Sequence, residues 1–202
     1  MKKGRARAEL IVRMARPHLS GVVVDVGADH GHVATMLSKE HDLVIATERR
    51  SNRLPNWPEN RVVADGLAPF SKVDLAIVCG MGPNAILHVL TNGARPAVAV
   101  VHSPERTDTL RRRLKEAGWR IDAEALAPEN GRFAEVLRVV PGEEPADGHA
   151  LLFGPYLMND PLLADHVAQT LGHWRRVMAS APEGSPGHER ARGWVDWLSG
   201  LA

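Results

Sequence analysis

Short apolar runs rich in valine, leucine, isoleucine and alanine recur along most of the chain and predict buried β-strands. They occupy residues 22–26, 43–47, 61–64, 73–79 and 97–101, and a closing pair follows at 119–126 and 133–140. Short β-branched runs with few polar interruptions are typical of strands covered on both faces of a parallel sheet. The pattern therefore indicates a largely parallel sheet with a closing pair of strands.

Amphipathic stretches between these runs predict the helices that cover the sheet. They span residues 5–18, 33–37, 85–90 and 105–117. Such an alternation of strands and helices predicts a doubly wound α/β fold. Residues 51–60 are an exception because they contain Pro55 and Pro58, and we expect a loop or one helical turn there.

The pattern changes after residue 140. Residues 141–148 have the composition of a linker, and residues 151–158 form an apolar segment that we expect to pack on the sheet. Residues 161–180 and 188–200 predict two helices, each with one buried face. We therefore divide the chain into an α/β domain at 1–140 and a C-terminal segment with a helical appendage at 141–202.

The turn after the first strand has the residue types of a ligand-binding site. Asp25 and Gly27 lie at the carboxyl end of the strand, and Asp29, His30 and Gly31 precede the next helix. Gly27 lets a ligand approach the backbone, and Gly31 allows close packing of the helix. The turn is a cofactor-binding candidate, although a tight turn without a ligand has similar glycines.

An acidic residue in the second strand supports this interpretation. Glu48 ends that strand about 20 residues after Gly27, where a carboxylate can accept hydrogen bonds from both hydroxyls of an adenosine ribose. The alternative is a solvated carboxylate beside Arg49 and Arg50.

The third and fourth strands end in further candidates. Asp65 and Gly66 follow the third strand, and Asp65 is placed either to accept from an adenine amino group or to act as an ordinary turn residue. Cys79 and Gly80 end the fourth strand and open a second close-approach turn, which leads into a helix at Pro83.

The charges of the first turn distinguish two adenosine cofactors. A pyrophosphate needs backbone N–H groups and a helix N-terminus free to meet its negative charge. Asp25 and Asp29 bracket the turn, and their carboxylates suit a ligand that carries an ammonium and a sulfonium. This favours S-adenosylmethionine over NAD, and a nucleotide-dependent dehydrogenase is the third-ranked alternative.

Composition and charge narrow the class of protein further. Cys79 is the only cysteine, and His30 and His32 are too sparse a pair to indicate a metal. No apolar run approaches the roughly 20 residues of a membrane span, so we expect a cytoplasmic protein with no membrane partner. Basic residues predict phosphate contacts with a nucleic acid, although solvated helix faces carry similar clusters. The clusters are Lys2, Lys3, Arg5, Arg7, Arg13 and Arg16, then Arg49, Arg50 and Arg53, then Arg106, Arg111, Arg112, Arg113 and Lys115.

Taken in order, these motifs resemble those of the bacterial tRNA (adenine-22-N1)-methyltransferases, class I enzymes that use S-adenosylmethionine. Residues 24–30 are similar to the Asp-Ile-Gly-Ser-Asp-His motif of that family, and Glu48 to its acidic residue after the second strand. Further matches are Asp65-Gly66-Leu67, Gly80-Met81-Gly82, Glu129-Asn130-Gly131 and Phe153-Gly154-Pro155. The departures are His32, Ala34, residues 101–104 in place of Leu-Gln-Pro-Asn, a shortened crossover after Glu48 and an abbreviated C-terminal region.

The resemblance implies a Rossmann-like class I methyltransferase sheet, S-adenosylmethionine as cofactor, tRNA as partner and adenine N1 as the methyl acceptor. Residues 1–140 would then be the catalytic domain that binds the cofactor. The expected cofactor-binding residues are Asp25, Gly27, Asp29, His30, Glu48, Asp65, Gly66, Cys79 and Gly80. Methyl transfer to another RNA or to a small molecule, and a non-catalytic RNA-binding relative, remain as alternatives.

Asp29 and His30 are the catalytic candidates. Methylated adenine is cationic, so a nearby carboxylate such as Asp29 would stabilise it, with His30 as a positioning group. Asp29 is alternatively placed to hold the cofactor ammonium or to cap the helix. His102 ranks below them, because a satisfied residue at the end of the fifth strand is the simpler interpretation.

Overall fold

The computed structural model describes residues 4–53 and 59–201, and its sheet has seven strands in the order β3-β2-β1-β4-β5-β7-β6. The strands are β1 Val23–Val26, β2 Val44–Glu48, β3 Arg61–Val63, β4 Leu75–Cys79, β5 Val98–His102, β6 Trp119–Glu129 and β7 Arg132–Pro141. The first five are parallel, whereas β7 is antiparallel to both β5 and β6. The predicted doubly wound sheet is confirmed, and its chain order reverses between β1 and β4.

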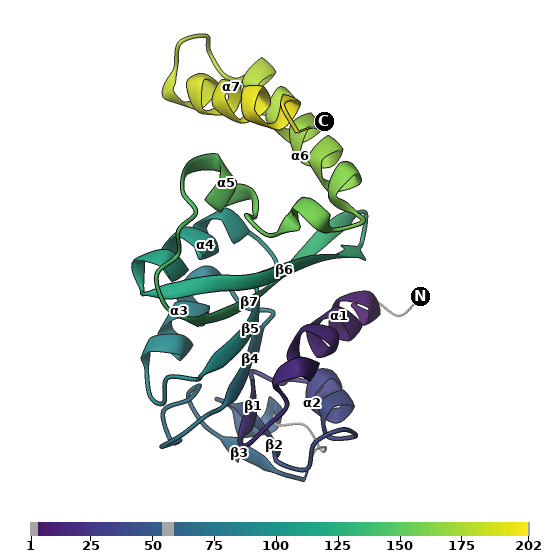
Figure 1. The fold of residues 1–202 in the computed structure, drawn as a ribbon, viewed down its shortest axis with the longest axis vertical. Coiled ribbons are helices and arrows are strands. Elements are labelled where there is room, and N and C mark those ends of the chain that lie inside the picture. The colour runs from purple at the N-terminus through teal and green to yellow at the C-terminus, as the bar shows by residue number, and fades with distance from the viewer. Residues whose placement is uncertain (1–3, 54–58, 202) are drawn as a thin grey trace.

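Helices cover both faces of this sheet (Figure 1). Their bounds are α1 Arg5–Ala15, α2 His32–Leu37, α3 Pro83–Thr91, α4 Thr107–Glu116, α5 Gly148–Phe153, α6 Leu163–Ser180 and α7 Pro186–Ser199. Short 3₁₀ helices lie at η1 Arg16–His18, η2 Ser51–Arg53 and η3 Leu157–Asn159. Leu54 to Pro58, in the expected loop between β2 and β3, lie outside the described residues.

The strands bury their two faces in different clusters. Val24 and Val26 of β1 pack with α3 and α4, whereas Val23 packs with α1 and α2. Because side chains alternate across a strand, Asp25 shares the α1 and α2 face with Val23. This places its carboxylate beneath the helix that begins after the first turn.

The closing strands form one long hairpin. Their turn is Asn130-Gly131, and both residues have positive φ values of 51° and 74°. Two consecutive positive φ values are what a tight two-residue hairpin turn requires, which explains an Asn-Gly pair at this point. The hairpin carries Glu129 and Glu135 toward the carboxyl ends of the parallel strands.

The C-terminal segment connects the sheet to a helical hairpin. Leu151 of α5 belongs to the cluster on the α3 and α4 face, so the expected packing of this segment on the sheet is confirmed. Phe153, two residues later, belongs to a separate cluster that Leu171 of α6 and Trp194 of α7 help to form. Figure 1 shows α6 leading away from the sheet, with α7 folded back against it.

Candidate functional site

The turn after β1 has an unusual backbone conformation and is hydrogen-bonded to β2. Gly27, Asp29 and Gly31 all have positive φ values, of 69°, 44° and 66°. Gly27 N–H and Ala28 N–H both donate to the Thr47 carbonyl, at 2.9 and 3.1 Å, which ties the turn to β2. Asp29 is the one residue of these three with a side chain, so its left-handed conformation is unusual.

Asp25 is buried at the base of this turn. Its side chain accepts a hydrogen bond from Ala34 N–H in the first turn of α2, with Oδ2 3.0 Å from the nitrogen. Burial raises the pKa of Asp25 to about 7, the Ala34 hydrogen bond opposes this shift, and the negative charge of Glu48 adds to it. Asp25 is therefore a carboxyl that a nearby cation would convert to its ionised form.

This pKa gives a prediction for Asp25→Asn. A carboxyl whose pKa is raised by folding stabilises the fold while it is protonated, and that contribution is lost as the pH rises through about 7. We expect the stability of the variant, measured relative to the wild type, to be higher at about pH 8.5 than at about pH 5.5. The reason is that the amide keeps an acceptor for Ala34 and buries no charge at the higher pH. Urea unfolding at both pH values tests this, and an unchanged difference between the two proteins would contradict it.

Glu48 closes the other side of the turn. Its Oε1 accepts from Asp29 N–H at 3.1 Å and its Oε2 accepts from Arg49 N–H at 3.2 Å. Each carboxylate oxygen has a further lone pair, so both can still accept from a ligand. The structure therefore couples the expected ribose carboxylate directly to the backbone of Asp29.

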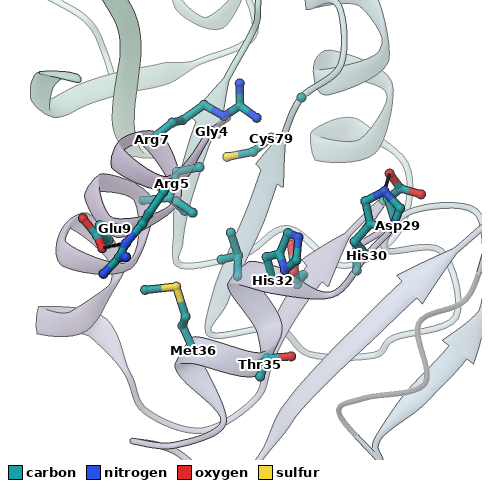
Figure 2. Close-up of a pocket in the computed structure, with 17 residues that line it drawn as sticks. Gly4, Arg5, Arg7, Glu9, Asp29, His30, His32, Thr35, Met36 and Cys79 are labelled. Carbon is teal, nitrogen blue, oxygen red and sulfur yellow. Dashed lines mark hydrogen bonds and ion pairs between the residues drawn. The ribbon is translucent and has the colours of Figure 1, made fainter. Parts of the chain in front are cut away.

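A cleft of about 640 Å³ lies beside the turn, between α1, α2 and the carboxyl ends of β1 and β4. Asp25, Gly27, Asp29, His30, Cys79 and Gly80, all expected from the sequence, line it together. Figure 2 shows one wall of the cleft formed by Gly4 and by Arg5, Arg7 and Glu9 of α1, opposite His32 and Met36 of α2.

Asp29 and His30 are exposed at the edge of this cleft. Asp29 Oδ2 lies 3.6 Å from His30 Nε2, and the two side chains are 56% and 78% exposed. The His30 ring also lies 5.8 Å from the ring of His32, centroid to centroid. The pair is thus accessible to a ligand that enters from solvent.

The β4 side of the cleft is formed by Cys79 and Gly80. Burial raises the pKa of the Cys79 thiol well above its usual range, so the sulfur stays protonated and forms part of the wall rather than a nucleophile. Gly80 has a φ of 80°, and its N–H donates to the carbonyl of His102 at 2.9 Å. This hydrogen bond joins the ends of β4 and β5 directly beneath the cleft.

Three expected residues are not among those that line the cleft: Glu48, which contacts the turn as described above, and Asp65 and Gly66. Asp65 is exposed and stands 3.5 Å from both Arg49 Nε and His88 Nε2. Gly66 has a φ of 60°, and a Cβ there would lie 3.1 Å from Val89 Cγ2, so close packing against α3 explains this glycine. A role of Asp65 or Gly66 in holding adenine stays a prediction.

Two features were not found from the sequence. Arg7 Nη1 of α1 lies 2.6 and 2.7 Å from the two carboxylate oxygens of Glu129, so α1 is tied to the tip of β6. His102, expected as a satisfied residue at the end of the fifth strand, is only 1% exposed, because β7 pairs with β5 on the side away from β4. The Glu129-Asn130-Gly131 motif matched the family pattern, but nothing local in it indicates a partner in the first helix.

The basic cluster at 111–113 requires a correction. Arg111 was expected to contact phosphates, but its guanidinium is 1% exposed and pairs with Glu124 and Glu135 at 2.7 Å each. Arg112 is exposed and remains available. Of the N-terminal cluster, Lys2 and Lys3 lie outside the described residues.

Neither a metal site nor a membrane span is found in the described residues. Residues 4–53 and 59–201 hold no group of three or more His, Cys, Asp or Glu side chains that is suited to a metal. Over the same ranges, every helix is too short or too polar to span a membrane.

A parallel sheet closed by an antiparallel hairpin, with an acid-flanked glycine turn at the point of chain reversal, is a Rossmann-like fold. The model of one family within it, tRNA (adenine(22)-N(1))-methyltransferase, matches residues 23–192, and the chain belongs to this family. No curated protein matches the chain by sequence.

Solved structures with the same fold cover nearly the whole chain. TrmK from M. capricolum, in complex with S-adenosyl-homocysteine, is 12% identical with a TM-score of 0.79, and the match covers 96% of this chain and 95% of that one. The B. subtilis m1A22 tRNA methyltransferase TrmK is 18% identical with a TM-score of 0.71, at 96% and 95% coverage. A Rossmann-superfamily protein from Streptococcus agalactiae is 20% identical with a TM-score of 0.80, also at 96% and 95%.

Proposed function

We propose that this chain transfers a methyl group from S-adenosylmethionine to N1 of adenine 22 in tRNA. The observation that carries the proposal is the family match over residues 23–192, which spans the whole sheet and most of the C-terminal hairpin. The cleft at the end of β1 and β4 supports it, because its carboxylates suit a cationic methyl donor. The product S-adenosyl-homocysteine is bound in the M. capricolum relative.

Methyl transfer to a ring nitrogen is an in-line displacement at the sulfonium methyl. Adenine N1 supplies its own lone pair, so the protein has to align the two reactants and exclude water rather than remove a proton. In this proposal Glu48 holds the ribose hydroxyls, Asp25 faces the ammonium, and Gly27 and Gly80 allow the ligand to lie against the backbone. Asp29 and His30 face the reacting base.

Adenine N1 lies on the base-pairing edge, so the nucleotide must be unpaired or extruded before it can react. We propose that residues 1–140 carry the cofactor and the reaction, and that residues 141–202 add tRNA contacts through α6 and α7. An enzyme acting on tRNA would work in the cytoplasm. Exposed arginines such as Arg13 and Arg112 are suited to the phosphate backbone.

The decisive experiment is methylation of in vitro transcribed tRNA with labelled cofactor, followed by mapping of the modified base. We expect label at adenine 22 and none in a transcript with guanine at that position. Label elsewhere in the tRNA would favour a different target, and cofactor binding without label would favour a non-catalytic RNA-binding relative. Calorimetry with NAD tests the dehydrogenase alternative, which requires that the chain bind NAD.

Glu48→Ala tests the cofactor site. We expect S-adenosylmethionine binding to weaken by about 2 kcal/mol or more, since hydrogen bonds to a charged group contribute about 1.5–3 kcal/mol each. Glu40→Ala is the matched control, because it removes an exposed carboxylate whose partner is Arg16, outside the cleft. Calorimetric Kd values are compared, and a folded Glu48 variant with the wild-type Kd would exclude Glu48 from the ribose site.

A further inference from the structure

His102 has an unusual position for a polar residue. It is the last residue of β5, it pairs in register with Cys79 of β4, and it is 1% exposed. Cys79 lines the cleft, and the carbonyl of His102 binds Gly80 N–H, which lines it too. His102 therefore stands directly behind the wall of the cleft.

One ring nitrogen of His102 is occupied and the other is not. Nδ1 lies 3.0 Å from the backbone carbonyl of Glu135 in β7, and a carbonyl only accepts, so Nδ1 carries the proton. Nε2 is buried and has no hydrogen-bond partner among the residues that the structure describes. A buried polar atom of this kind calls for an explanation, because nearly all such atoms are satisfied in native proteins.

The ring is kept neutral by its surroundings. Burial lowers the pKa of His102, the Glu135 hydrogen bond opposes this, and the positive charge of Arg7 lowers the pKa further, whereas Glu129 and Glu135 raise it. A neutral ring with a proton on Nδ1 presents a lone pair at Nε2. The missing partner is therefore a hydrogen-bond donor.

Arg7 and Glu129 mark the side from which a donor can arrive. Their ion pair joins α1 to the tip of the hairpin, and Arg7 also lines the cleft with Cys79 (Figure 2). Arg7 is 30% exposed, whereas Glu129 and Glu135 are each 18% exposed, so Arg7 is the most accessible of the charges that act on His102.

We propose that His102 Nε2 accepts a hydrogen bond from the exocyclic amino group of the target adenine, and so makes the site specific for adenine. The inference rests on the function proposed above. The amino group is bonded to the carbon next to N1, and a base that binds Nε2 through it is fixed close to its reacting nitrogen. The Arg7 and Glu129 pair moves aside when the base enters.

The same contact rejects guanine and favours the reaction. Where adenine has its amino group, guanine has an oxygen acceptor, which would face the Nε2 lone pair. A site that requires a hydrogen-bond donor discriminates strongly against a base that has none at that position. Methylation at N1 spreads positive charge onto the amino group and makes it a stronger donor. The hydrogen bond is therefore strongest in the transition state, where it increases the rate.

His102→Asn and His102→Gln form a matched pair for the test. Asn places its amide near the position of Nδ1 and keeps the link to Glu135, whereas Gln places a polar atom near the position of Nε2. Each variant and the wild type is given two ligated tRNAs, with either adenine or purine at position 22. Purine lacks the amino group. Its intrinsic reactivity is weaker than that of adenine, but this difference is the same for every protein and cancels when the adenine-to-purine rate ratios of the proteins are compared.

We expect the wild type to prefer adenine over purine in single-turnover rate, and the Asn variant to lose about 10-fold or more of that preference, as for one buried hydrogen bond. The Gln variant is expected to keep most of the preference. The Kd for S-adenosylmethionine is expected to stay at the wild-type value in both. An Asn variant with the full wild-type preference overturns the proposal.

A second measurement needs no variant. In the wild type with ¹⁵N-labelled histidine and S-adenosyl-homocysteine, the Nε2 resonance of His102 is expected to shift on binding the adenine tRNA and not the purine tRNA. Equal spectra with the two tRNAs overturn the proposal even if the Asn variant does not fold. A wild type that leaves the adenine transcript unmethylated overturns the proposed function instead, so the two failures are distinguishable.

Discussion

Replacing Arg111 with methionine is expected to lower the free energy of unfolding by about 3–5 kcal/mol, because it breaks a buried ion pair and leaves its partner uncompensated. Arg111 Nε lies 2.7 Å from Glu124 Oε1, and both side chains are 1% exposed. Its Nη2 lies 2.7 Å from Glu135 Oε2, and its Nη1 donates to the Leu152 carbonyl at 3.0 Å. Urea unfolding measures the loss.

The contacts of Arg111 also show what else the substitution would disturb. Leu152 belongs to α5, and Glu124 Oε2 accepts from Tyr156 N–H at 3.0 Å, so the network joins α4 and the hairpin to the C-terminal segment. A chain that ends near Val140 lacks both backbone partners and Leu151, and we expect it to be less stable than the full chain.

Arg112→Met is the matched control for Arg111. Arg112 is the next residue of α4, its side chain is 57% exposed, and its pair with Glu116 spans 3.7 Å. We expect its loss to change the stability by no more than about 0.5 kcal/mol. Adding Glu124→Gln to Arg111→Met should recover part of the lost stability, because it removes an unpaired buried charge. Equal effects of the two arginine substitutions would show that the network does not stabilise the fold.

Arg111 and Arg112 are neighbours in the sequence, but one is buried and the other is exposed. Their charges are identical, and grouping them as one basic cluster was wrong for Arg111. The sequence did contain a pattern that indicates the burial of Arg111, since Thr107, Leu110, Arg111 and Leu114 follow helical spacing and all are buried. The carboxylates that allow the burial lie in β6 and β7, which only the folded chain brings to α4.

The parts of the candidate site that the sequence predicted depend on residues that are close together in the chain. Gly27 and Gly80 were identified as close-approach glycines at the ends of parallel strands, and both have the positive φ that glycine adopts easily. Glu48 was placed by its spacing, and it does contact the first turn. The Arg7 and Glu129 pair and the depth of His102 depend on where β7 inserts into the sheet, which no local pattern of the sequence shows.

Asp29→Asn is expected to lower the turnover by about 10²-fold or more while Kd values for cofactor and tRNA stay within a few-fold, if the carboxylate stabilises the cationic adenine. Asp29 has a φ of 44° where a glycine would be relaxed, and asparagine tolerates this left-handed conformation at least as well as aspartate. The substitution thus removes the charge and leaves the turn intact, including the hydrogen bond from the Asp29 backbone to Glu48.

The alternative role for Asp29 predicts a different pattern. A carboxylate that holds the cofactor ammonium contributes in the ground state as well, so its loss weakens S-adenosylmethionine binding while the rate at saturation stays normal. Asp42→Asn is a suitable control, since it removes an exposed carboxylate just before β2, at the opposite end of the strand from Glu48. Both Kd values and the single-turnover rate are measured on one tRNA. A loss confined to cofactor binding would remove Asp29 from the catalytic step and leave it as a ligand of the methyl donor.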